Sequence, residues 1–150
     1  MGKYDLVEKV LGELKAEFFF NGVMIQPGKP LVFGRALGTF FFGLPGNPLS
    51  TMVTFELFVR PALALLSGES VAPLAFLRAR LSKDFRRRPG LDAFLPALLD
   101  GSYHDPQVSL VEWKGSGDVA SLGRANCFLA VPEDVSEMKV GEWVSVLPRS

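Results

Sequence analysis

Cysteine and histidine are almost absent from this sequence, which has one of each among its 150 residues, Cys127 and His104. A lone cysteine excludes an internal disulfide and any zinc site built from several thiolates of this chain. A lone histidine excludes a histidine-rich metal cluster. We expect Cys127, inside the apolar run "NCFLAV", to be a core residue and His104 to lie in a loop. Such cysteine usage is typical of a reducing, cytoplasmic setting.

Net charge is also lacking, because 16 basic and 16 acidic residues cancel. A general nucleic-acid binder depends on many phosphate contacts, so we expect no nucleic-acid partner. No membrane span is expected either, since Glu56, Arg60 and Pro61 interrupt the longest apolar stretches. Residues 3–17 alternate charges with aliphatic side chains and do not resemble a signal peptide. The composition, 48% hydrophobic and 21% charged, is that of a chain with a folded core.

The sequence up to about residue 44 predicts one helix and three strands. Residues 5–16 repeat apolar side chains at helical spacing, and residues 18–25 ("FFFNGVMI") form a strand-like run. The turn signal "QPGKP" ends that run. "LVFGRA" then predicts a second strand, joined through Leu37 and Gly38 to the strand "TFFFGL".

The strand "TFFFGL" and the helix after it are expected to be buried. The strand is so apolar that we expect both of its faces to be covered. The helix should run from Pro48 to about Leu66, kinked or interrupted at Pro61, and it is apolar on nearly every side.

The composition changes at "SGESVAP", residues 67–73, which we interpret as a domain boundary between residues 1–70 and 71–150. Five short apolar runs follow, separated by turn residues: "LAFLRARL", "DAFLPALL", "QVSLVEW", "NCFLAVP" and "EWVSVLP". Short strands at this spacing predict a small barrel or sandwich.

The corner "LPGNPLS" between strand and helix is the most specific local feature. Asn47 precedes a proline, which favours the extended backbone of an N-cap, and Pro48 suits the first helical position. Gly46 allows close approach of the backbone. We predict that amides of the first helical turn face an anion here, with the Ser50 hydroxyl nearby. The alternative is a capped helix with no ligand.

Four segments, in this order, resemble the MoeA-type molybdopterin molybdenumtransferase family, which includes the gephyrin E domain: "MGKYDLVEKVL", "IQPGKPLVFG", "FFGLPGNPLSTMVTFELFVRPAL" and "EWVSVLP". The resemblance implies an α/β fold: the C-terminal half of a three-layer molybdopterin-binding domain (1–70), followed by an all-β barrel domain (71–150). It implies an enzyme that inserts molybdate into adenylylated molybdopterin with release of AMP. Tungstate, an oxyanion of the same charge and similar size, remains an alternative metal source.

The resemblance also implies site residues. Lys29, in the turn Pro27-Gly28-Lys29, would lie beside the ligand's phosphate or molybdate; the alternative is a solvated lysine. Asp5 would hold Mg²⁺ or orient the pterin edge; the alternative is an N-cap of the first helix. The corner Pro45, Gly46, Asn47 and Pro48 would place the backbone against the ligand. Ser116 in "KGSGD" would contact molybdate, or belong to an ordinary hairpin turn.

The sequence departs from the family pattern in three places. Gly22 and Gln26 stand where members often carry basic residues, and Leu91 follows Gly90 where an arginine is common. Arg86, Arg87 or Arg88 would substitute for that family arginine. The alternative is that these three arginines form an exposed basic end of a strand.

The third departure concerns the family's "Ser-Gly-Gly-Val-Ser" segment, which is missing here. Met1 and Gly2 would be the last two residues left of it. We therefore expect a C-terminal portion that needs a homodimer mate or partner chain for the rest of the site. The alternative function is a non-catalytic molybdopterin-binding or scaffolding fragment.

Overall fold

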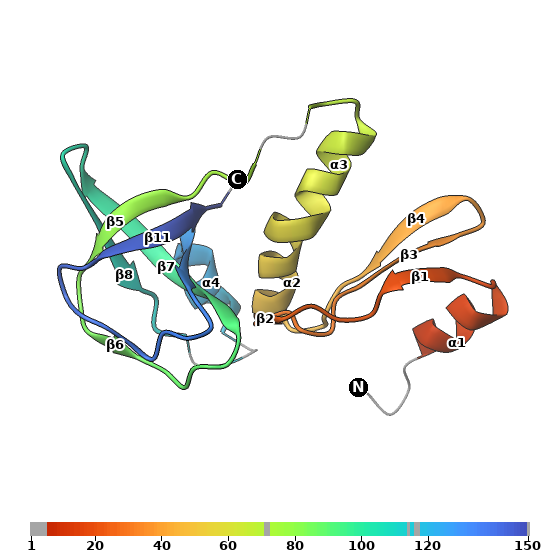
Figure 1. The fold of residues 1–150 in the computed structure, drawn as a ribbon, viewed down its shortest axis with the longest axis horizontal. Coiled ribbons are helices and arrows are strands. Elements are labelled where there is room, and N and C mark those ends of the chain that lie inside the picture. Colours follow the sequence, from red (N-terminus) through yellow and green to blue (C-terminus); the bar gives the residue numbers. More distant parts are fainter. Residues whose placement is uncertain (1–5, 71–72, 114, 116–117, 150) are drawn as a thin grey trace.

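The structure, a computed structural model, describes residues 6–70, 73–113, 115 and 118–149. Figure 1 shows one long helix between a small sheet on one side and a β-barrel on the other. The elements before the barrel are α1 (Leu6–Glu13), β1 (Glu17–Phe20), β2 (Ile25–Gln26), β3 (Val32–Ala36), β4 (Thr39–Gly43), α2 (Pro48–Thr54), the π-helical segment η1 (Phe55–Val59) and α3 (Arg60–Leu66). The later elements are β5 (Leu77–Leu81), β6 (Phe85–Arg86), β7 (Asp92–Ser102), β8 (Asp105–Leu110), α4 (Val119–Arg124), β9 (Cys127–Val131), β10 (Glu137–Met138) and β11 (Trp143–Pro148).

The small sheet is antiparallel, with strand order β1-β3-β4. Leu37 and Gly38 join β3 to β4 with φ values of 50° and 79°, as a tight hairpin turn requires, so the predicted hairpin is confirmed. The single strand predicted over residues 18–25 is wrong. The chain leaves the sheet after Phe20, and β2 instead pairs with β7 of the barrel.

Aromatic rings fill the small sheet. The register shifts between Phe18 and Phe20, so Phe19 and Phe20 both contact Phe33, with ring centroids 5.2 and 5.7 Å away. Phe33 also stacks on Phe42 at 4.5 Å. The expected burial of β4 on both faces is wrong, because its phenylalanines pack mainly against other rings of the same sheet. Phe40 remains 45% exposed.

The helix runs without interruption from Pro48 to Leu66. Its irregularity precedes Pro61: the Arg60 N–H bonds to the Phe55 carbonyl, five residues back, in a widened turn. The proline is thus accommodated by a π-helical turn and does not break the helix. The expectation of a mostly buried helix is wrong, since no residue of α3 is buried and Leu66 is 64% exposed. By length and composition alone, this helix meets the criteria for a membrane span.

The strands after residue 77 close into a barrel, which decides between the two predicted β architectures. The order is β7-β8-β5-β11-β9, and β9 pairs again with β7. The long strand β7 makes both contacts: Ala93 to Ala97 pair with β9, and Ala97 to Ser102 pair with β8. All five predicted runs contribute a strand. The short helix α4 was not predicted.

Two hydrophobic clusters form the core. The first fills the barrel and includes Cys127, which is fully buried as predicted. Burial raises the pKa of its thiol to about 11. We call the second the junction cluster; its buried members are Ile25, Leu49, Val53, Phe94, Leu122 and Phe128. This cluster joins α2 and β2 to the outer face of the barrel and α4, so segments from both sides of residue 70 share one core.

Candidate functional site

The corner before α2 has the predicted capping geometry. Asn47 is extended, at φ −75° and ψ 125°, and its Oδ1 accepts from the amides of Leu49 (3.0 Å) and Ser50 (3.4 Å). The Thr51 hydroxyl donates to the carbonyls of Asn47 and Pro45, which fastens the corner to the helix. These bonds hold the segment from residue 45 to residue 51 in one conformation.

The same bonds correct the predicted anion site. The first-turn amides of Leu49 and Ser50 are occupied by the Asn47 side chain, and Pro48 has no N–H. The amides that remain lie one step earlier, at Gly46 and Asn47, and neither donates to another residue that the structure describes. Ser50 is buried beside the corner. A ligand at the corner would therefore be bound ahead of the helix rather than by its first turn.

The turn that carries Lys29 packs against the same helix. Gly28 adopts a φ of 120°, and a Cβ there would lie 2.6 Å from Cγ2 of Thr54. The Thr54 hydroxyl donates to the Ser50 carbonyl, one helical turn closer to the corner. Lys29 is exposed and forms no ion pair within the described part of the chain, while its carbonyl accepts from the Val23 amide. The structure thus brings the Pro27–Lys29 turn and the 45–48 corner to consecutive turns of α2.

Asp5 and Ser116 lie outside the described residues, but both flanks of the Ser116 loop are placed. Trp113 packs against the junction cluster on one side of the loop. On the other side Asp118 caps α4 by accepting from the Ser121 amide, and Leu122 of α4 belongs to the junction cluster. The described residues on either side of the loop, Trp113 and Leu122, therefore lie at the cluster that also holds Leu49 of α2.

Two features near the corner carried no sequence signal. The first is the buried contact of Gly28 with Thr54, because residues distant in sequence make it. The second is the Trp113 Nε1–H, which is buried and has no hydrogen-bond partner in the part of the chain that the structure describes. Gly28 lies in the "PGKP" turn, but that motif does not indicate a contact with Thr54, and Trp113 lies in no motif.

A magnesium site is not supported by the described side chains, among which no group of three or more His, Cys, Asp and Glu residues could hold a metal. The Mg²⁺ prediction rested on Asp5 alone. Carboxylate oxygens are the ligands that this ion prefers. We derive no chemical step through Mg²⁺.

The basic cluster over residues 78–88 is mostly structural. Arg87 donates to the carbonyls of Val135, Leu91, Pro132 and Glu133, which ties the start of β7 to the β9–β10 loop. Arg86 pairs with Glu137 at 2.8 Å. Of the three arginines proposed to replace a family arginine, only Arg88 has no side-chain hydrogen bond or ion pair with another described residue.

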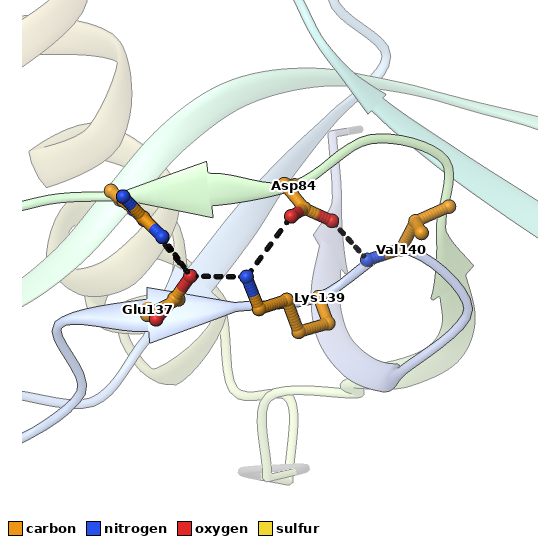
Figure 2. A network of polar contacts seen from close by, with 5 residues as sticks. Asp84, Glu137, Lys139 and Val140 are labelled. Carbon is orange, nitrogen blue, oxygen red and sulfur yellow. Dashed lines mark hydrogen bonds and ion pairs between the residues drawn. The ribbon is translucent and has the colours of Figure 1, made fainter.

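A charge network links β6 to β10 across the barrel surface (Figure 2). Lys139 lies between Asp84, at 3.1 Å, and Glu137. The pKa of Asp84 is lowered from 3.8, first by the hydrogen bond from the Val140 amide and then by Lys139. The pKa of Glu137 is lowered from 4.5 by Lys139 and Arg86, and both carboxylates raise the pKa of Lys139 above 10.5.

Acid should weaken this network. Because the folded-state pKa values of Asp84 and Glu137 are lowered, their stabilisation is present above the ordinary values of 3.8 and 4.5. It is lost as the pH falls through the folded values. We expect Asp84→Asn, which can still accept the Val140 amide, to flatten part of the fall in melting temperature between about pH 5 and about pH 2. An unchanged pH slope in Asp84→Asn would show that the network contributes no pH-dependent stability.

Family models match both parts of the chain. Residues 1–65 match the model described as "Probable molybdopterin binding domain", and residues 78–148 match "MoeA C-terminal region (domain IV)". The molybdopterin molybdenumtransferase of Staphylococcus aureus is 29% identical over 147 residues, which are 98% of this chain and 35% of that protein. The molybdenum cofactor synthesis protein cinnamon of Drosophila melanogaster is 41% identical over 155 residues, covering all of this chain and 25% of that protein.

A solved structure shares the fold. The molybdopterin biosynthesis MoeA protein of Pyrococcus horikoshii superposes with a TM-score of 0.77 at 36% identity, covering 96% of this chain and 34% of that one. The chain therefore spans about a third or less of the length of these relatives. The mixed α/β segment followed by a small barrel is the architecture that the sequence predicted.

Proposed function

The chain belongs to the MoeA family of molybdenum cofactor synthesis proteins, and from that premise we propose that it forms part of a site for molybdate insertion. In the proposed reaction, adenylylated molybdopterin and molybdate are the substrates, the metal enters the dithiolene, and AMP is released. One observation carries the proposal: the Lys29 turn and the Asn47 corner, the two most specific motifs, lie on consecutive turns of one helix.

In this site Lys29 would position and neutralise the oxyanion. Its ammonium is exposed and has no ion-pair partner among the described residues, so it is available to phosphate or molybdate. The amides of Gly46 and Asn47 would add two neutral donors. Pro45 and Pro48 would fix the backbone between them, and Ser116 would approach from the barrel side. Catalysis would rest on positioning and electrostatic stabilisation, without a protein nucleophile.

We propose a homodimer mate or partner chain at this site; the chain spans about a third of the length of its curated relatives. The apolar surface of the β1-β3-β4 sheet, with Phe18 and Phe40 about half exposed, supports such a contact. Any Mg²⁺ requirement would involve Asp5, and we expect a cytoplasmic location. The second candidate function, pterin binding or scaffolding without turnover, is favoured by the missing basic residues at Gly22 and Gln26.

Pterin retention tests the proposal. We expect the chain, purified from cells that make molybdopterin, to yield a fluorescent pterin after oxidation, and Lys29→Glu to retain about tenfold less, because a charge-assisted contact becomes repulsive. Lys83→Glu is the matched control, an exposed lysine of the barrel with the same charge change. Equal pterin in Lys29→Glu and Lys83→Glu, or none in the wild type, would count against the site. Release of AMP that occurs only after a partner segment is added would favour the enzymatic function over non-catalytic scaffolding.

A further inference from the structure

Lys29 is exposed at the tip of a loop that is closed and partly buried, residues 23–31, which we call the Lys29 loop. Gly28 and Leu31 are buried, and the Leu31 amide donates to the Gly28 carbonyl at 3.2 Å. The Val23 amide donates to the Lys29 carbonyl at 2.9 Å. Because the lysine side chain is long and flexible, its charge is placed only as well as the backbone that carries it. The contacts that fix this loop therefore decide how well Lys29 can meet a ligand.

The Lys29 loop is held on two sides. On the helix side, Gly28 packs against Thr54 of α2. On the barrel side, β2 belongs to the loop and pairs in parallel with the first two residues of β7, so that Ile25 lies opposite Asp92. Ile25 also contacts Gly28, since a Cβ there would lie 3.2 Å from Cδ1 of Ile25. A parallel ladder of two residues has little stability of its own, so it depends on how firmly the start of β7 is fixed.

Asp92 fixes the start of β7. Its Oδ1 accepts from the Glu133 amide at 2.9 Å, which ties β7 to the segment that follows β9. Arg87 supports the same end of the strand by donating to the Leu91 carbonyl. Asp92 thus joins two parts of the molecule. It lies opposite Ile25 of the Lys29 loop in the ladder, and its side chain is bonded to the barrel.

We propose that Asp92 is a positioning residue for Lys29: by fixing the start of β7, it keeps the Lys29 loop in the conformation that binds the oxyanion. The inference rests on the proposed function and gives the barrel a part in it. Without the hydrogen bond from Glu133, the start of β7 and the paired β2 would sample several positions. Only a fraction of the molecules would then present Lys29 correctly, and the apparent affinity for the ligand falls in proportion to that fraction.

Asp84 offers a matched control for a substitution of Asp92. Its Oδ1 accepts from the Val140 amide at 2.9 Å, the same distance as in the Asp92 contact, and both bonds are exposed (Figure 2). Its other bond is to Lys139, so both of these bonds join parts of the barrel. Asp92→Ala and Asp84→Ala each remove one negative charge, which by itself favours an anionic ligand. A loss of binding confined to Asp92→Ala therefore cannot come from the change in charge.

Pterin retention and hydrogen exchange, both measured on the full chain, test the inference. We expect Asp92→Ala to retain about fivefold less pterin than the wild type, and Asp84→Ala to retain as much as the wild type. Exchange in the unliganded proteins reports on the loop directly. The amides of Val23 and Leu31 should exchange about fivefold faster in Asp92→Ala and at the wild-type rate in Asp84→Ala. Asp92→Asn keeps the Oδ1 acceptor and should restore both measurements.

The possible failures are distinguishable. Unchanged exchange at Val23 and Leu31 in Asp92→Ala, or faster exchange there without loss of pterin, would overturn this inference and leave the proposed function standing. The same changes in Asp84→Ala would also overturn it, since they would show a general loosening of the barrel. Equal pterin in Lys29→Glu and Lys83→Glu, or none in the wild type, would overturn the proposed function and this inference together.

Discussion

Gly28→Ala should destabilise the protein by about 3 kcal/mol, because the new methyl group faces two penalties at once. A φ of 120° is open essentially only to glycine, and the added Cβ would lie 2.6 Å from the Thr54 methyl. Thr54 is fully buried and cannot move aside without disturbing α2. Urea unfolding followed by circular dichroism measures the loss. Because Lys29 is the next residue, the variant should also lose pterin retention.

A double-mutant cycle separates the steric part from the backbone part. Thr54→Ser removes the opposing methyl and keeps the hydroxyl that bonds to the Ser50 carbonyl. We expect the double variant to be more stable than the sum of the two single effects by about 1–2 kcal/mol. Gly38→Ala is the matched control, since Gly38 also has a positive φ, 79°, but open space where the Cβ would be. It should cost only about 1 kcal/mol. A Gly28→Ala variant no less stable than Gly38→Ala would contradict the packing of the Lys29 turn on α2.

Local rules predicted the corner well. Asn47 before Pro48 specified the cap, and Leu37-Gly38 specified the hairpin, because each depends on backbone preferences of adjacent residues. The same reasoning overestimated the anion site. The side chain that makes Asn47 a good cap also occupies the amides of Leu49 and Ser50. Capping and amide-based anion binding compete for the same donors.

Burial was harder to predict than secondary structure. The apolar composition of "TFFFGL" and of residues 60–66 indicated burial, yet much of this surface is exposed or covers only its own sheet. Whether an apolar face is buried depends on elements that lie far away in the sequence, and a local sequence pattern carries no information about them. For the same reason no sequence pattern indicated that Trp113 packs against the junction cluster, or that β2 joins the barrel sheet.

Arg87→Ala should be the most destabilising surface change in the barrel, with a loss of about 2–3 kcal/mol. The Arg87 guanidinium donates to four backbone carbonyls, in the segments before β7 and between β9 and β10. Its removal would leave all four acceptors without their charged donor, and the bonds to Val135 and Leu91 are partly buried. Arg88→Ala, which truncates the exposed neighbour, is the control and should change stability by less than about 0.5 kcal/mol.

Hydrogen exchange would show whether Arg87 acts as a clamp between the two loops. The Arg87 amide bonds to the Ser136 carbonyl, and the Gly90 amide bonds to the Glu133 carbonyl, at 2.9 and 2.8 Å. Both amides should exchange faster in Arg87→Ala, ahead of the strand amides of the barrel. Arg87→Lys should restore only part of the protection, since an ammonium cannot reach all four carbonyls. Equal exchange in Arg87→Ala and Arg88→Ala would mean that backbone pairing alone holds the loops. Arg87 would then be free for the ligand role that the family pattern assigns to a nearby arginine.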